Sequence, residues 1–256
     1  MIHKTALIDG KAELDSGVEV GPYSIIGPNV KIGKNTKIGP HVVIDRWTQI
    51  GEGCNILQFS SIGAAPQDLK YLGEESWVII GNNNTLREFV TINRGTSQSG
   101  GKTIIGNNNF FMAYCHVAHD CRIGNHVILA NAATLAGHIQ IEDHAIVGGL
   151  VGVHQFVRLG CHSIIGGGSG VNKDIPPYTM ANGQRAKLYG LNSVGLKRHN
   201  FSEDVLRNLK KAYRLILRSN HTLEKALELA KDEISNSPEV DHFIDFIKNS
   251  ERGITR

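Results

Sequence analysis

The histidines of this sequence are concentrated where chemistry is most easily imagined. Seven of the 12 lie between residues 116 and 162, and two of them belong to the string Cys115-His116-Val117-Ala118-His119-Asp120-Cys121. An imidazole titrates near neutral pH, so His119, with a carboxylate at Asp120 or elsewhere to orient it, is a candidate general base. The same string also contains thiol, imidazole and carboxylate groups of the kinds that bind zinc.

A six-residue repeat must position these side chains. Every sixth residue is Ile, Leu, Val or Phe at 26 positions, in three runs that span residues 2–62, 80–92 and 105–171. A period of six fits neither a helix nor simple strand alternation. It is typical of parallel β-helices, in which short extended segments alternate with tight turns and each segment contributes one large inward residue.

The repeat also predicts dimensions and interruptions. Three hexapeptides per coil give about 8.7 coils and, at the usual strand spacing, a prism about 42 Å long. The breaks at 63–79 and 97–102 are predicted to be loops ejected from the prism. Loops on a rigid scaffold are common places for binding residues.

The repeat ends at Pro176-Pro177, and a helical pattern follows. An apolar stripe from Val205 to Ile216 predicts a helix capped by Ser202. A second helix is predicted from about 223 to 234 with Thr222 as its cap, and a third after Ser237-Pro238. We therefore expect two domains, a β-helix over 1–185 and a helical domain over 186–256 that caps the prism.

The coil length of 18 residues sorts the histidines into two groups. One group is an 18-residue ladder at a turn-like place of the repeat, for which a stacked column of exposed turn residues is the simpler interpretation: His126, His144 and His162. The other breaks the ladder and falls on adjacent coils, which favours a site: His116, His119, His138 and His154.

The repeat also weighs against metal and phosphate chemistry. Cys115 and Cys121 occupy the same small inward place as Cys54, so they should face the core on successive sides of the prism and cannot converge on one ion. No metal is expected. The glycine-rich run at 166–170 lacks the Lys-Ser/Thr of a phosphate-binding loop, and its glycines fall where the turns need them.

Composition and charge exclude several classes. No apolar run approaches the length of a membrane span, and the first residues lack the features of a signal peptide. The four cysteines form no CxxC pair. Residues 1–185 carry 14 basic and 14 acidic side chains, against 13 and 10 in 186–256, which is too weak an excess for nucleic-acid binding. A cytoplasmic protein is expected.

Several strings together resemble the UDP-N-acetylglucosamine O-acyltransferase family of lipid A biosynthesis, from end to end. They are GAAPQDLKYLGE at 63–74, TINRGT at 91–96, HVAHDCRIGN at 116–125, ILANAATLAGH at 128–138, VHQF at 153–156, GGGSGV at 166–171, DIPPY at 174–178 and LNSVGLKRHNFS at 191–202. The combination is far more specific than the hexapeptide repeat, which many unrelated enzymes share.

The resemblance implies a homotrimer of left-handed parallel β-helices with active sites in clefts between prisms. The implied reaction transfers a 3-hydroxyacyl group from acyl carrier protein to the 3-hydroxyl of UDP-N-acetylglucosamine, the first step of lipid A biosynthesis. His119 would be the general base, Asp120 would orient or polarise it, and the amide of Gly137 would be the oxyanion donor. No cofactor or metal is implied, because a thioester is already activated.

The resemblance also implies a set of substrate-binding residues. Sugar and acyl contacts would come from Gln67, Asp68, Lys70, His116, His138, His154 and Gln155. Asn192 and Arg198 would hold the nucleotide, and Gly167 would help to set acyl-chain length. Basic side chains of the C-terminal region would steer the acidic carrier protein: Lys197, Arg198, Arg207, Lys210, Lys211 and Arg214.

Three residues depart from the family's pattern. Asn93 replaces a histidine that members often have, and Val194 and His199 replace acidic and arginine residues of the nucleotide segment. We expect weaker or differently oriented nucleotide binding.

Other functions stay open from sequence. One is the N-acyltransferase of the same pathway, which normally carries an extra N-terminal domain. Another is an acetyltransferase that uses acetyl-CoA, and a third is an inactive paralogue that kept only the scaffold. Neither the acyl length nor the choice between UDP-N-acetylglucosamine and a 3-amino analogue is fixed by the sequence.

Overall fold

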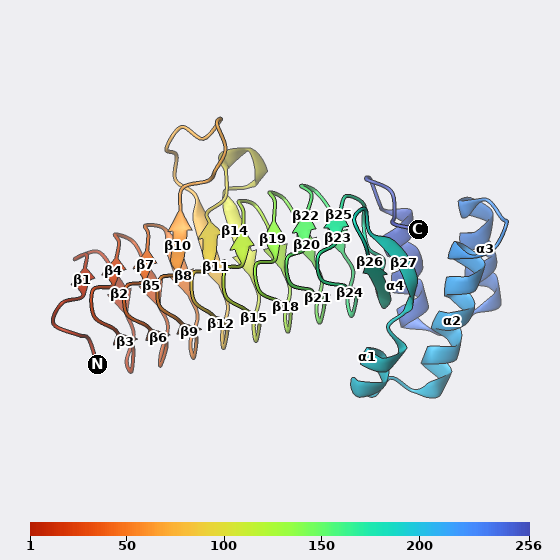
Figure 1. The fold of residues 1–256 in the computed structure, drawn as a ribbon, viewed down its shortest axis with the longest axis horizontal. Coiled ribbons are helices and arrows are strands. Elements are labelled where there is room, and N and C mark those ends of the chain that lie inside the picture. The colour runs from red at the N-terminus through yellow and green to blue at the C-terminus, as the bar shows by residue number, and fades with distance from the viewer.

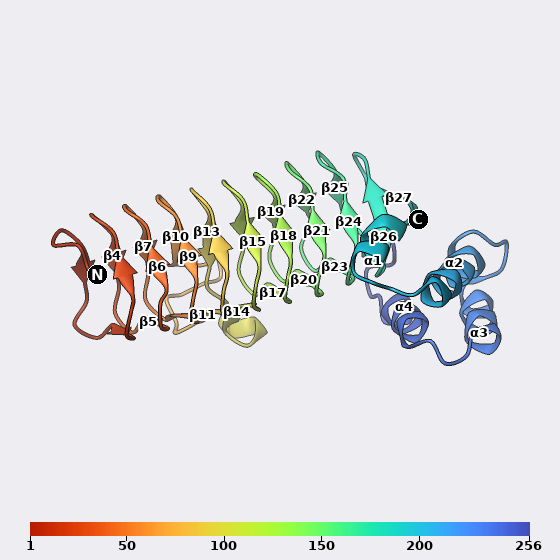
Figure 2. The ribbon, with the colours of Figure 1, turned by 90° about the horizontal axis from the view of Figure 1, so that it is seen from below.

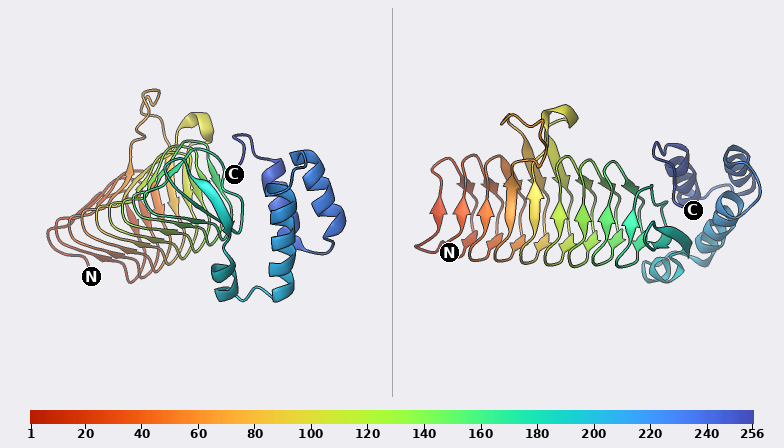
Figure 3. Two further views of the ribbon diagram at one scale, coloured as in Figure 1. Left: turned by 45° about the vertical axis from the view of Figure 1, so that its right-hand side comes forward. Right: turned by 45° about the horizontal axis from the view of Figure 1, so that its top comes forward.

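The computed structural model describes all residues, 1–256, and separates a long prism from a small group of helices (Figure 1). The chain winds as a left-handed parallel β-helix, the fold class predicted from the repeat and the family resemblance. The nested coils have a three-sided cross-section (Figure 3). The N-terminus lies at one end of the prism, and the helices gather at the other (Figure 2).

Three parallel sheets form the sides of the prism. The first contains β1 (Leu7–Ile8), β4 (Ile25–Ile26), β7 (Val43–Ile44), β10 (Ser61–Ala64), β13 (Thr91–Asn93), β16 (His116–Val117), β19 (Thr134–Leu135), β22 (Gly152–Val153) and β25 (Gly170–Val171). The second contains β2 (Glu13–Leu14), β5 (Lys31–Ile32), β8 (Thr48–Ile50), β11 (Trp77–Ile80), β14 (Lys102–Ile105), β17 (Arg122–Ile123), β20 (Gln140–Ile141) and β23 (Arg158–Leu159). The third contains β3 (Glu19–Val20), β6 (Lys37–Ile38), β9 (Asn55–Ile56), β12 (Thr85–Leu86), β15 (Phe110–Phe111), β18 (Ile128–Leu129), β21 (Ile146–Val147), β24 (Ile164–Ile165), β26 (Thr179–Asn182) and β27 (Lys187–Leu191).

The repeated apolar residues fill the prism, as predicted, except in the first coil. From Val20 onwards they are buried, and they pair in register from coil to coil, as Ile26 does with Ile44 and Val117 with Leu135. The first coil has no coil before it to cover its open end, so Ile2 is 51% exposed.

The corners between sheets require an unusual backbone conformation. Most corners after the first coil contain a non-glycine residue with φ near +60°, a region that L-residues rarely adopt. Asp120 and His138 are two such residues, and the rungs of the histidine ladder are three more. Corner amides bond to the preceding coil, as His138 N–H does to the His119 carbonyl at 3.0 Å, which helps to hold this conformation.

Two loops leave the prism at one edge, between the first and second sheets. Residues 65–76 connect β10 to β11, and the segment containing the 3-10 helix η1 (Ser97–Ser99) connects β13 to β14. They project side by side in Figures 1 and 3. A hydrogen bond of 3.0 Å from Ser97 Oγ to the Glu74 carboxylate joins them.

The C-terminal helices are α1 (Ser193–Arg198), α2 (Glu203–Leu217), α3 (Leu223–Glu233) and α4 (Pro238–Lys248). The predicted caps are confirmed, because the hydroxyls of Ser202 and Thr222 accept the amides of Val205 and Lys225. The short α1 was not predicted. Its signal was Asn192, whose side chain caps the helix by accepting the Gly195 amide.

β27 pairs antiparallel with β26 and closes the third sheet before α1 begins. The division of the chain at residue 185 stays a prediction. No helix of the structure has both the length and the apolar character that crossing a membrane requires.

Candidate active site

The coil geometry places His119 and Asp120 at the corner between β16 and β17, beside the two ejected loops. Nδ1 of His119 lies 2.8 Å from Oδ2 of Asp120. The Asp120 side chain is almost entirely buried, whereas the imidazole is partly exposed. A carboxylate accepts, so Nδ1 carries the proton and Nε2 keeps its lone pair. The pair is therefore arranged for Nε2 to act as a base.

Asp120 is itself held by two threonines. Thr96 donates its amide to Oδ1 at 2.8 Å and its hydroxyl to Oδ2 at 2.7 Å, while the Asp120 amide donates to Oγ1 of Thr103 at 2.8 Å. Burial by itself would raise the pKa of Asp120, but the hydrogen bonds from His119 and Thr96 outweigh it and lower that pKa. The carboxylate is thus ionised at neutral pH and fixed in direction.

Gly137, on the next coil, lies against the imidazole. A Cβ atom at this position would be 2.7 Å from Cε1 and 2.9 Å from Nε2 of His119, so a larger residue cannot be accommodated without moving the ring. The Gly137 amide donates to no acceptor in the protein. The residue that carries this free N–H therefore packs against the ring whose Nε2 would act as base.

His138 lies near the same carboxylate and its ring packs edge-to-face on that of His119. Its Nε2 is 3.9 Å from Oδ2 of Asp120, its Nδ1 is 3.1 Å from Oγ of Ser99, and its ring stacks on Phe156 at 4.5 Å. Burial lowers its pKa despite the carboxylate nearby. His138 and Asp120 line a separate cavity of about 500 Å³.

His116 approaches the same corner from within strand β16. Its Nδ1 is 2.7 Å from Oγ1 of Thr91 on the preceding coil. Burial, and to a lesser degree the neighbouring His119, lower the pKa of His116. It is therefore a neutral polar group at neutral pH.

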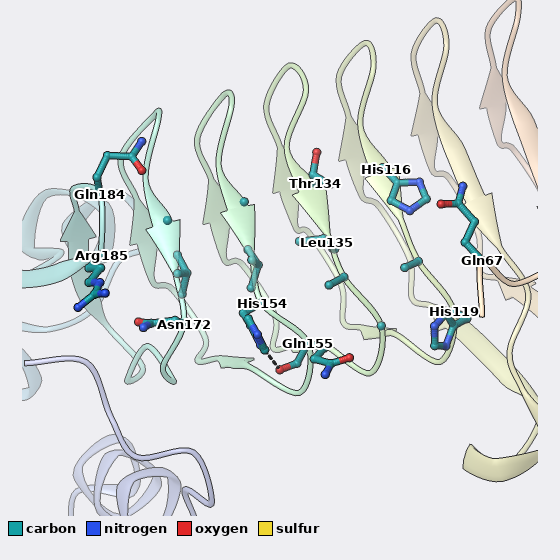
Figure 4. Close-up of a pocket in the computed structure, with 17 residues that line it drawn as sticks. Gln67, His116, His119, Thr134, Leu135, His154, Gln155, Asn172, Gln184 and Arg185 are labelled. Carbon is teal, nitrogen blue, oxygen red and sulfur yellow. Dashed lines mark hydrogen bonds between the residues drawn. The ribbon is translucent and has the colours of Figure 1, made fainter. Parts of the chain in front are cut away.

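His116, His119 and Gly137 line a cleft of about 860 Å³ along the outer face of the first sheet. The floor of the cleft is formed by three residues that follow His116 in register on successive coils, Thr134, Gly152 and Gly170. Their small side chains leave room for a ligand. Figure 4 shows Gln67, His116 and His119 toward one end of the cleft and Gln184 and Arg185 at the other. His154 and Gln155 lie between them, joined by a hydrogen bond of 3.2 Å from the His154 ring to the Gln155 carbonyl.

A buried arginine anchors the loop that carries Gln67. Arg94 bonds to the Gly63 carbonyl, to the Asp45 carboxylate at 3.2 Å and to the Tyr71 hydroxyl at 3.2 Å. Within the loop, the carboxylate of Asp68 accepts the Lys70 amide at 2.9 Å. Asp68 and Lys70 do not line the cleft, although Asp68 is close enough to act on the charge of His138.

Three predicted residues lie away from the cleft of this chain. Gly167 is at the corner between the third and first sheets, and Arg198 is exposed at the end of α1. Both ends of the Asn192 amide are already engaged, one by capping α1 and the other by donating to the His162 carbonyl at 2.9 Å. The three therefore do not join His119 within one chain.

Sequence reasoning missed other residues of this region. Gln184 and Arg185 line the cleft, but they follow the end of the six-residue repeat, so the repeat could not predict their positions. Thr96 ends the TINRGT string and Arg94 lies inside it, yet their contacts with Asp120 and with the loop depend on neighbouring coils. Asn93 is buried and donates to the Ala65 carbonyl at 2.8 Å, at the root of the same loop.

A left-handed hexapeptide β-helix with a His–Asp pair in a cleft defines the class of hexapeptide-repeat acyltransferases. Profiles of bacterial transferase hexapeptide repeats match residues 11–46, 29–64 and 102–137. The profile described as UDP-N-acetylglucosamine O-acyltransferase, domain 2, matches residues 174–255.

The acyl-[acyl-carrier-protein]–UDP-N-acetylglucosamine O-acyltransferase of Thermodesulfovibrio yellowstonii is 56% identical over 255 residues, which cover 100% of this chain and 99% of the relative. That of Neisseria gonorrhoeae is 49% identical with the same coverage. The crystal structure of the UDP-N-acetylglucosamine acyltransferase from Bacteroides fragilis has a TM-score of 0.98 at 45% identity and covers all of both chains. The chain belongs to this family and is an acyltransferase.

Proposed function

We propose that the protein transfers a 3-hydroxyacyl chain from acyl carrier protein to the 3-hydroxyl of UDP-N-acetylglucosamine, the first step of lipid A biosynthesis. The observation that carries the proposal is the His119–Asp120 pair, set against the free amide of Gly137 in the large cleft. The names of the relatives supply the two substrates.

The proposed chemistry needs only groups of the chain. Nε2 of His119 takes the proton of the sugar hydroxyl while the oxygen attacks the thioester carbonyl. The Gly137 amide donates a hydrogen bond to the oxyanion that forms. The tetrahedral intermediate then collapses to the ester, and the leaving thiolate recovers the proton from His119. Asp120 keeps the imidazole in the tautomer that this cycle requires.

The remaining predicted residues fit roles around this centre. Gln67, His154 and Gln155 line the cleft and would contact the sugar or the acyl chain. Asp68, Lys70 and His138 do not line it in this chain, but Asp68 acts on the charge of His138, and the three would contact the substrate from beside the cleft. Asn192, Arg198 and Gly167 would act on a cleft shared with a neighbouring subunit.

A homotrimer is the assembly that supports such sharing. The outer face of the first sheet exposes Leu7, Ile25 and Val43. An exposed column of stacked rings follows the edge between the third and first sheets: Tyr23, His41, Phe59, Phe89 and Tyr114. A contiguous apolar surface of this kind is typical of an interface. We expect a second copy to cover it, and Phe59→Glu to dissociate the assembly in analytical ultracentrifugation.

The carrier protein would approach α2. Four basic side chains of this helix surround a shallow cavity: Arg207, Lys210, Lys211 and Arg214. Arg207 and Lys211 pair with Asp204 and Glu233, at 2.7 and 2.8 Å, so part of this charge is neutralised. The cytoplasmic location stays a prediction.

The test is an acyl-transfer assay with UDP-N-acetylglucosamine and 3-hydroxyacyl carrier proteins of several lengths, read by mass spectrometry. We expect an O-acylated product, and a loss of about 10²–10⁴-fold in kcat for His119→Ala. His126→Ala, at a different edge of the prism, is the matched control and should keep full activity. Transfer only to an amino sugar, or from acetyl-CoA, would identify one of the alternative enzymes. No transfer by a folded trimer would favour an inactive paralogue.

A further inference from the structure

A second histidine cluster lies at the edge between the second and third sheets. The rings of His126, His144 and His162 stack along this edge, with centroids 4.7 and 4.6 Å apart. His199, at the end of α1, approaches the column from the side. Its ring is 4.8 Å from those of both His144 and His162, at interplanar angles of 62° and 72°.

Three of these imidazoles lie close together. The ring nitrogens of His144, His162 and His199 include one from each ring that all lie within 4.8 Å of one another. His144 and His162 come from successive coils, and α1 supplies His199. Three potential ligands from two parts of the fold therefore lie within reach of one another.

The nitrogens of this cluster are unengaged, unlike those of the other clusters. In His119–Asp120–His138 and in Glu142–Cys161–His242, a carboxylate oxygen lies 2.8 Å from a ring nitrogen. No protein hydrogen bond involves a ring nitrogen of His144, His162 or His199. His144 and His162 are partly buried and His199 is exposed, so an ion can reach them from solvent.

We propose that His144, His162 and His199 bind one divalent transition-metal ion of the Zn²⁺ type. Three imidazoles with a water in the fourth position form a known zinc ligand set. Tetrahedral Zn–N bonds of about 2.0–2.1 Å place ligand nitrogens about 3.3 Å apart. Nitrogens that are up to 4.8 Å apart must therefore approach by as much as about 1.5 Å. Imidazole lone pairs lie in the ring plane, so the stacked rings of His144 and His162, which are 12° from parallel, must each rotate toward the ion, and the exposed His199 must rotate to meet them.

The site would fasten α1 to the prism. Asn192, which caps α1, already bonds to the carbonyl of His162, so helix and coil are in contact before an ion arrives. A metal bridging His199 to the two coil residues would add a second attachment. This inference departs from the absence of metal expected from sequence, because the spacing of His126, His144 and His162 gave no sign that His199 would join them.

The experiment titrates the purified full-length protein with Co²⁺, whose visible absorption reports tetrahedral coordination, and then displaces Co²⁺ with Zn²⁺. We expect one Co²⁺ per chain and a rise in Tm with Zn²⁺. His199→Ala and His162→Asn should each weaken binding at least tenfold and remove the Tm shift. His199 is exposed, so its variant should fold; circular dichroism checks this.

Two variants are matched controls. His126→Ala removes the rung of the ladder outside the proposed ligands, and His242→Ala disrupts the Glu142–Cys161–His242 cluster. Both should bind Co²⁺ as the unmodified protein does. The proposal is overturned if the folded protein shows no tetrahedral Co²⁺ spectrum, if His199→Ala binds equally well, or if His242→Ala abolishes binding.

Discussion

The imidazole of His119 rests directly on the backbone of Gly137, one coil further along the prism. The contact is so close that a methyl group on residue 137 would overlap Cε1 and Nε2 of the ring. The proposed base and the proposed oxyanion donor are therefore adjacent because no side chain separates them. This relationship makes glycine a requirement of the site rather than of the turn, since the φ of Gly137 is not positive.

Gly137→Ala should therefore impair transfer without unfolding the protein. The new methyl must displace the ring, and a misplacement of about 1 Å in a catalytic group costs about 10²-fold in rate. We expect kcat/KM to fall by about that factor with an unchanged circular dichroism spectrum. Gly10→Ala is the matched control, because Gly10 occupies the same corner position in the first coil and a Cβ there would have no neighbour within 4 Å. Equal activity of the two variants would contradict the argument.

Asp120→Asn should reduce stability at neutral pH. The amide places a donor toward groups that already donate, Thr96 and His119, at a cost of about 1–3 kcal/mol. Because the folded pKa of Asp120 is lowered, its contribution is present above its ordinary pKa of 3.8 and is lost as pH falls through the folded value.

The measurement for Asp120→Asn is urea unfolding at pH 7 and at several values below pH 4. The difference from the unmodified protein should be largest at pH 7 and shrink on acidification. A difference that stays constant with pH would show that the ionised carboxylate is not the cause.

Arg94→Lys should loosen the loop that carries Gln67. Lysine cannot reproduce the planar contacts of Arg94 with Gly63, Asp45 and Tyr71, so we expect a loss of about 1–3 kcal/mol and a higher KM for the sugar nucleotide. Arg46→Lys is the control, because Arg46 is half exposed and makes a weaker contact, with its Nε 3.8 Å from the Asp45 carboxylate. An unchanged KM in Arg94→Lys would show that the anchoring of this loop does not affect substrate binding.

His242→Gln should destabilise the attachment of α4 to the prism in a pH-dependent way. Hydrogen bonding to Cys161 and to the Glu142 carboxylate raises the pKa of His242 to about 10. A raised folded pKa means that the stabilisation is fully present below the ordinary value of 6.5 and is lost as pH rises through about 10. The side chains of His242 and Glu142 are 41% and 28% exposed, so solvent screens their interaction. The change in the free energy of unfolding should therefore be at most about 1 kcal/mol.

Chemical unfolding at pH 6 and pH 10 tests the His242 prediction. The difference between His242→Gln and the unmodified protein should be measurable at pH 6 and nearly absent at pH 10. His221→Gln, at an exposed position between α2 and α3, should show no such dependence. The reverse trend with pH would rule out the Glu142–His242 pair as the source.

Much of this molecule follows from the sequence because its fold is nearly one-dimensional. Each coil contacts only its neighbours, so a period of six is sufficient to place the repeated apolar residues, from Val20 to Val171, in the core and to bring His119 and His138 to one edge. The helix caps Ser202 and Thr222 could be predicted for a similar reason, because the hydroxyl of a cap accepts a hydrogen bond from an amide only three residues further along the chain.

Contacts outside that short range needed the tertiary structure. The loops that leave the prism do not follow the six-residue repeat, so the repeat does not predict which residues they contact. The anchoring of Asp120 by Thr96 and of the 65–76 loop by Arg94 was therefore visible only in the structure. The same is true of His199, which α1 carries to the ladder at His144 and His162. Sequence by itself determined the scaffold and the proposed base, because these depend on local repetition. The tertiary structure decided which distant groups orient that base, shape the cleft and converge on the second histidine cluster.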